Sequence, residues 1–107
     1  MSFSLEDLAE IVRARRSASA EKSYTKSLFE RGVPVIAKKF GEEAVETVIA
    51  ALGDDKTALT GEIADLLYHL TVLMEAKGVT LAAVLSELQR RTTQSGHAEK
   101  AARSPPQ

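Results

Sequence analysis

The 107-residue sequence contains no cysteine, and aromatic residues make up only 5% of it. Without cysteine the chain can form neither disulfides nor thiolate zinc sites, and it has no cysteine nucleophile. Any metal must therefore be held by oxygen or imidazole ligands. The sequence also lacks a basic, apolar leader and any run of membrane-spanning length. We therefore expect a cytoplasmic protein with no membrane partner.

An excess of either charge is missing too, because the formal net charge is -1. A chain without surplus positive charge has no global field that attracts a polynucleotide, so we expect no nucleic-acid partner. Any anion must then be bound locally, through clustered bases or through a cation. The hydrophobic fraction of 44% and the charged fraction of 27% are typical of a folded protein. The length favours one domain over residues 1–94, followed by a flexible C-terminal tail over 95–107.

Strand signals are scarce, whereas apolar residues recur three and four positions apart. This pattern predicts an all-α fold, a small bundle of four to five helices. Ser4 and Thr80 are expected N-caps and Gly78 an expected left-handed C-cap. The expected helices cover about 4–16, 34–52, 56–76 and 80–91, with a short helical turn between 23 and 32.

The short connections between the last three helices favour antiparallel neighbours. So few helices leave apolar faces uncovered, and we therefore expect self-association, most simply a homodimer, to complete the core.

Three acids of the segment GEEAVE, Glu42, Glu43 and Glu46, fall within an arc of about 100° on a helical wheel. An apolar arc adjoins them and places the carboxylates at the border of the expected core. The residues of that arc are Val45, Val48, Ile49 and Leu52.

A second acidic pair, Glu62 and Asp65, lies about 60° apart on the next helix, where the run IADLLYHLTVLM surrounds Asp65 with apolar residues. If the two helices pack as an antiparallel pair, the acidic faces meet in a partly desolvated place. Like charges there must bind protons or recruit a cation, and an all-oxygen cage is what Mg²⁺ or Mn²⁺ prefers. Such an ion usually keeps positions for substrate phosphates, so the pattern favours phosphate chemistry.

Other interpretations of these residues stay open at this point. A Glu-x-x-Glu spacing alone is usually a solvated helix face, which would suit a non-enzymatic helical interaction module. His69 lies on the same strip as Glu62 and Asp65 and could serve as a base or as a partner that supports Asp65, but a lone inward histidine is more often a hydrogen-bonded core residue. We leave His69 out of the catalytic set and interpret Tyr68 as a packing residue.

From about residue 23 to 91 the sequence resembles the phosphoribosyl-ATP pyrophosphohydrolase family of histidine biosynthesis. That family belongs to the all-α nucleotide pyrophosphohydrolase superfamily, which includes MazG-like proteins and dimeric dUTPases. The strings that carry the resemblance are SYT at 23–25, KKFGEEAVETVIAAL at 38–52 and EIADLLYHLTVLM at 62–74. The resemblance implies an Mg²⁺-dependent hydrolysis of phosphoribosyl-ATP to phosphoribosyl-AMP and pyrophosphate, in which Mn²⁺ could substitute.

The resemblance also implies roles for individual residues. The positions that match metal ligands are Glu43, Glu46, Glu62 and Asp65, and those expected to act in catalysis are Glu43, Glu46 and Glu42. The positions expected to contact substrate are Lys39, Lys38, Ser23, Tyr24 and Thr25. A house-cleaning pyrophosphohydrolase of the MazG or dUTPase type, acting on free nucleoside triphosphates through the same cage, is the alternative.

Overall fold

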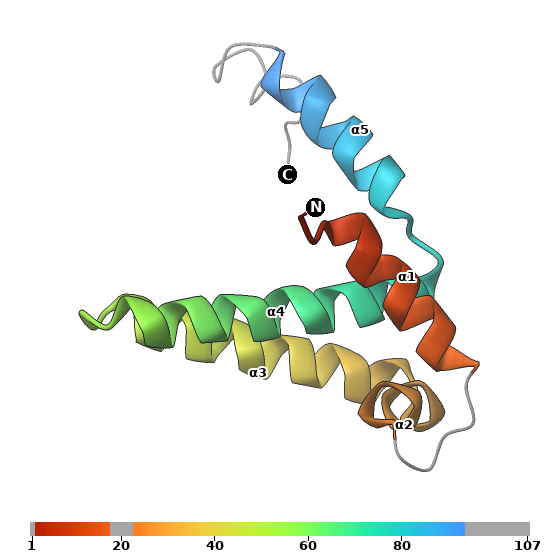
Figure 1. Ribbon diagram of the computed structural model, residues 1–107, viewed down its shortest axis with the longest axis horizontal. Helices are drawn as coiled ribbons and strands as arrows, with labels where there is room; N and C mark the ends of the chain where they lie inside the picture. The colour runs from red at the N-terminus through yellow and green to blue at the C-terminus, as the bar shows by residue number, and fades with distance from the viewer. Residues whose placement is uncertain (1, 18–22, 94–107) are drawn as a thin grey trace, which may run out of the picture.

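A computed structural model describes residues 2–17 and 23–93, and over these residues the chain is helical without a strand. The all-α prediction is thus confirmed (Figure 1). The helices are α1 (Leu5–Arg16), α2 (Tyr24–Arg31), α3 (Val33–Ala51), α4 (Lys56–Lys77) and α5 (Leu81–Thr92). The tail predicted over 95–107 lies outside the described residues.

The helices begin and end at the capping residues that the sequence contains. The Ser4 hydroxyl accepts from the Asp7 amide, and the Asp7 carboxylate accepts from the Ser4 amide, each at 3.0 Å, which completes a capping box at α1. Thr80 caps α5 by accepting from Ala83, and Gly78 ends α4 in the left-handed conformation with φ 72°. The short turn expected after residue 23 is a full helix, α2, because Ser23 caps it and Leu28 anchors it in the core.

Two long helices, α3 and α4, form an antiparallel pair joined by a tight loop (Figure 1). At the end of the pair away from that loop, α2 packs on α3 and α1 crosses α4. The completely buried apolar side chains come one from each of these four helices: Val12, Leu28, Ile36 and Val72. The core therefore lies at the beginning of α3 and the end of α4, and the middle of the pair lies outside it.

The last helix does not follow the expected antiparallel course. Between α4 and α5 the chain bends by 109°, so α5 points away from α4 and contacts α1 instead (Figure 1). The prediction for this connection was wrong because the left-handed Gly78, followed by the bond from the Val79 amide to the Met74 carbonyl at 2.9 Å, redirects the chain. Leu85 and Leu88 of α5 are consequently exposed.

One apolar face of α3 is also exposed. Its residues, Val45, Val48, Ile49 and Leu52, have side chains that are 59 to 84% accessible, and we call them the α3 stripe. The sequence predicts that this arc faces the core, with the carboxylates at its border, but within a single chain the arc faces solvent. No single helix of the described residues has both the length and the apolar character to cross a membrane; the bent pair of α4 and α5 meets those criteria only jointly.

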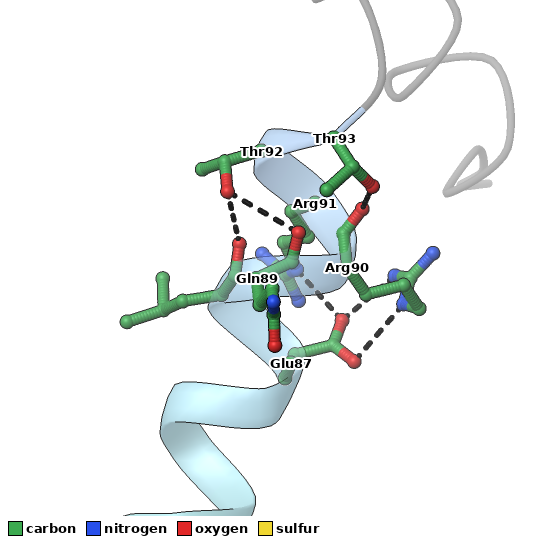
Figure 2. Close-up of polar contacts among 7 residues, drawn as sticks. Glu87, Gln89, Arg90, Arg91, Thr92 and Thr93 are labelled. Atoms are coloured by element: carbon green, nitrogen blue, oxygen red, sulfur yellow. Dashed lines mark hydrogen bonds and ion pairs between the residues drawn. The ribbon is translucent and has the colours of Figure 1, made fainter.

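The last turns of α5 carry a cluster of charged side chains (Figure 2). The Glu87 carboxylate accepts hydrogen bonds from Arg90 at 2.7 Å and from Arg91 at 2.8 Å. These bonds lower the pKa of Glu87 to about 2. The cluster is exposed, so screening by solvent and salt limits its contribution to stability.

Truncation of Ile36 should destabilise the fold in proportion to the atoms removed, because its side chain is completely buried. We expect Ile36→Val to lower the free energy of unfolding by about 0.5–1.5 kcal/mol and Ile36→Ala by about 2–5 kcal/mol. Urea unfolding at one fixed protein concentration measures both. Equal effects from the two variants would contradict a core at this end of the helix pair.

Candidate metal centre

Three carboxylates meet between α3 and α4. Glu43 comes from α3, and Glu62 and Asp65 come from successive turns of α4. One oxygen of each lies within 4.8 Å of the others. The spacing of three residues puts Glu62 and Asp65 on one face of α4, and the antiparallel packing brings that face against Glu43. The acidic face of α3 therefore meets the acidic face of α4, as the helical wheels indicated for an antiparallel pair.

Two oxygens of this group are buried without a hydrogen-bond partner, Glu43 Oε1 and Glu62 Oε1. Burial is the main cause that raises the pKa of both carboxyls above 4.5. For Glu43 the next cause is the charge of Glu46, and for Glu62 it is a contact with the Glu46 carboxyl group. A buried charge without a partner is costly, and a cation would relieve the burial and the repulsion together. The all-oxygen donor set fits Mg²⁺ or Mn²⁺.

The other two acids of α3 lie around this group. Glu46 is exposed, and its charge acts on both Glu43 and Glu62, which places it at the solvent side of the cluster. Glu42 is exposed and pairs with Lys39, whose Nζ is 3.7 Å from Glu42 Oε1. The Lys39 ammonium is also near enough to lower the pKa of Glu43, opposing the larger effects that raise it. The cluster therefore has an acidic and a basic neighbour on its open side.

A threonine that the sequence reasoning missed connects the two helices at this level. The Thr47 hydroxyl lies 2.8 Å from the Glu43 carbonyl oxygen and 3.3 Å from that of Glu62, and it donates to them. It therefore ties the backbones that carry two of the acids. The sequence places Thr47 one helical turn after Glu43, which predicts its bond to the Glu43 carbonyl oxygen. That spacing gives no indication of the second contact, with Glu62 on α4.

The segment 23–25 lies next to α4, and its three residues have different environments. Ser23 accepts from the Lys26 amide as the N-cap of α2. Thr25 is 1% exposed, and its hydroxyl contacts the Tyr68 hydroxyl. Tyr24 is half-exposed and contacts His69. Of these residues, Tyr24 presents the largest surface to a ligand.

His69 and Tyr68 have the packing roles expected of them. His69 is buried, and its Nδ1 lies 2.8 Å from the Asp65 carbonyl oxygen, so it contacts the backbone of Asp65 and not its carboxylate. Tyr68 packs against the core. His69 is thus buried and hydrogen-bonded, whereas the sequence left its role open. Lys38 lies exposed on α3, beside Lys39.

The chain matches one protein family and is similar to several proteins that share one name. Residues 5–92 match the family described as phosphoribosyl-ATP pyrophosphohydrolase. A protein of Azorhizobium caulinodans named phosphoribosyl-ATP pyrophosphatase is 60% identical over 99 residues, which cover 92% of this chain and 91% of the relative. A protein of the same name from Methylobacterium nodulans is 56% identical over 97% of both chains. One from Rhizorhabdus wittichii is 54% identical over 96% of this chain and 97% of its own.

The carboxylate cluster predicts an unusual pH dependence for the metal-free protein. Because the pKa values of Glu43 and Glu62 are raised in the folded state, the folded chain binds more protons than the unfolded chain above pH 4.5. Stability contributed by these groups therefore falls as the pH rises through their raised pKa values and is regained on acidification toward 4.5. Thermal unfolding in a chelator from pH 7 to 4.5 measures this effect.

Glu62→Gln should flatten that pH dependence, and Mg²⁺ at neutral pH should raise the unfolding temperature of the unaltered protein more than that of the variant. Glu10→Gln, which removes an exposed acid of α1, is the matched control and should change neither result. A pH dependence that survives in Glu62→Gln would show that the cluster does not cause it.

Proposed function

Because this chain belongs to the phosphoribosyl-ATP pyrophosphohydrolase family, we propose that it hydrolyses phosphoribosyl-ATP to phosphoribosyl-AMP and pyrophosphate, in the second step of histidine biosynthesis. The observation that carries the proposal is the convergence of Glu43, Glu62 and Asp65 within 4.8 Å. A pyrophosphohydrolase must bring a water molecule to a polyphosphate that repels nucleophiles, and this requires positive charge at the phosphates. A carboxylate cluster that recruits a cation meets that requirement.

We assign Mg²⁺ to this cluster, with Glu43, Glu62 and Asp65 as its ligands. Glu46 is a fourth carboxylate beside these ligands, on the side of the cluster that faces solvent. The support is the pair of buried oxygens without partners and the all-oxygen donor set. When bound, such an ion supplies positive charge beside the phosphates and acidifies water at the site. The chain's own contribution is to hold the ligands on two rigid helices that Thr47 ties together.

The residues at the open side have separate tasks in this proposal. Glu46 is exposed to water yet adjacent to the ligands, so it is placed to orient the attacking water and accept its proton. Lys39, which the Glu42 carboxylate holds at 3.7 Å, supplies a positive charge for the phosphates. The residues assigned to the substrate side of the site are Lys38, Ser23, Tyr24 and Thr25. Of the three residues 23–25, Tyr24 has the accessible surface, whereas the buried Thr25 can act only by supporting its neighbours.

We further propose that the active form is a homodimer. The α3 stripe and the exposed Leu85 and Leu88 of α5 leave large apolar side chains in contact with water in a single chain. Exposed apolar side chains of this size are typical of residues that an interface covers. A second copy has the same faces and covers them by a closed two-fold contact. The stripe adjoins the acids of α3, so the partner would also lie beside the carboxylate cluster.

The activity itself can be tested with purified protein, phosphoribosyl-ATP and Mg²⁺. We expect Glu46→Gln to lower kcat by about 10²–10⁴ if it accepts the proton of water. Glu10→Gln is the control and should retain full activity. Faster turnover of dUTP or dCTP than of phosphoribosyl-ATP would replace the proposed substrate by free nucleoside triphosphates, and no effect of Glu46→Gln would remove its assigned role.

The dimer can be tested by introducing a charge into the α3 stripe. We expect Val48→Lys to convert the protein to a monomer of lower stability, because the ammonium group would be buried without a partner at the interface. Ala14→Lys introduces the same group at an exposed position of α1 and should leave the dimer intact. Sedimentation equilibrium measures the mass of each, and an unaltered mass for Val48→Lys would place the interface elsewhere.

A further inference from the structure

Both ring nitrogens of His69 are engaged, and they connect two parts of the site. Nδ1 lies 2.8 Å from the Asp65 carbonyl oxygen, and Nε2 lies 3.2 Å from the Tyr24 hydroxyl. A carbonyl oxygen can only accept, so Nδ1 donates, and in the neutral ring Nε2 accepts the proton of Tyr24. The ring is only 5% exposed, which shields both bonds from water. His69 thus joins the first residue of α2 to the helix that carries Glu62 and Asp65.

The ring of Tyr24 is held on two sides and open on another. It packs against Tyr68 with 6.2 Å between ring centroids and 24° between ring planes, while His69 fixes its hydroxyl. Tyr68 in turn contacts the His69 ring edge-on at 4.9 Å. The Tyr24 side chain nevertheless remains 48% exposed. A flat aromatic surface that is both fixed and accessible is the arrangement on which nucleic-acid bases stack.

This aromatic group lies beside the carboxylates. His69 lies one helical turn after Asp65 on α4, and its Nδ1 is 2.8 Å from the Asp65 carbonyl oxygen. Tyr24 is bonded directly to His69, so a single side chain separates it from the cluster. A nucleotide whose phosphates lie at the cluster could therefore bring its base to Tyr24.

We propose that His69 is a positioning residue whose hydrogen bond fixes Tyr24 as a platform on which the purine of the nucleotide stacks. The inference rests on the proposed function for the identity of the substrate. The hydrogen bond and the exposed ring are features of this chain whichever nucleotide it hydrolyses. The first test separates the platform from the group that orients it.

Steady-state kinetics with phosphoribosyl-ATP should show a graded series. Tyr24→Ala removes the platform and should raise KM by roughly fivefold to a hundredfold. Tyr24→Phe and His69→Asn each remove the same hydrogen bond and should each raise KM by about fivefold, with kcat nearly unchanged. The variant that combines Tyr24→Phe with His69→Asn should have a KM no higher than the higher of the two single variants, because both changes remove one shared bond. A KM increase in the double variant equal to the product of the two single increases would overturn the proposal, and so would an unchanged KM in Tyr24→Ala.

Thr71→Val is the matched control. It also removes a half-buried hydroxyl of α4 that is bonded within its own helix, at 2.8 Å to the Leu67 carbonyl oxygen. That bond involves neither Tyr24 nor His69, so the variant should leave KM unchanged. An equal rise of KM in Thr71→Val would mean that any loosening of α4 produces the effect, and the positioning role would be rejected.

A spectroscopic test does not depend on turnover. The sequence has two tyrosines and no tryptophan, so in Tyr68→Phe all intrinsic fluorescence above that of phenylalanine comes from Tyr24. AMP contains no phosphoanhydride bond and therefore stays intact in the presence of Mg²⁺. We expect AMP to quench this fluorescence and UMP to quench it less, because a purine has the larger stacking surface. Adding His69→Asn should raise the AMP concentration for half-quenching by about fivefold.

The outcomes distinguish the two proposals. If AMP leaves the Tyr24 fluorescence unchanged, the platform is rejected even where the protein hydrolyses phosphoribosyl-ATP. If AMP quenches and phosphoribosyl-ATP is not hydrolysed, the platform stands and the proposed function fails. Circular dichroism of each variant verifies that the helices are retained.

Discussion

Repulsion among carboxylates at the contact between α3 and α4 is the constraint on which the rest of the structure depends. The two helices form the most extensive contact of the described chain, and they do so where Glu43, Glu62 and Asp65 meet. Packing favours the contact and charge opposes it. A bound cation would relieve this repulsion, because each carboxylate would then be attracted to the same positive charge. The proposed metal site therefore bears directly on the stability of the central helix pair.

The contacts that stabilise the fold lie on either side of the carboxylate cluster. The buried core is confined to one end of the pair, where α1 and α2 cover it, so folding there does not require the carboxylates to be neutralised. Thr47 ties the helix backbones directly behind the acids. The apolar surface left on α3 and α5 is large relative to so small a core. A second copy of the chain would supply the missing burial.

Local signals in the sequence predicted the helices, because their causes are local. Ser4, Thr80 and Gly78 mark helix ends through bonds that span a few residues, and the acidic faces follow from helical periodicity alone. The course of α5 was not predictable in this way, since a left-handed glycine ends a helix without specifying the direction of the next. The contact of Tyr24 with His69 spans positions far apart in sequence, so no pattern along one helix reveals it.

The same limit applies within the acidic cluster. The spacing identified Glu42, Glu43 and Glu46 as neighbours on one face, but which oxygens converge depends on the packing of α4 against that face. Glu43 meets the α4 acids, whereas Glu42 pairs with Lys39. The resemblance to a family identified the segments, and the geometry separated the acids that face α4 from the acid that pairs outward.

The connection between α3 and α4 has a consequence for how the chain folds. All three converging carboxylates belong to one helical hairpin closed by a short loop, so they are neighbours along the chain as well as in space. Contacts of such low sequence separation form early, because little chain entropy is lost in closing the loop. The convergence of the three carboxylates therefore requires only the closure of this hairpin and does not depend on the packing of α1, α2 or α5.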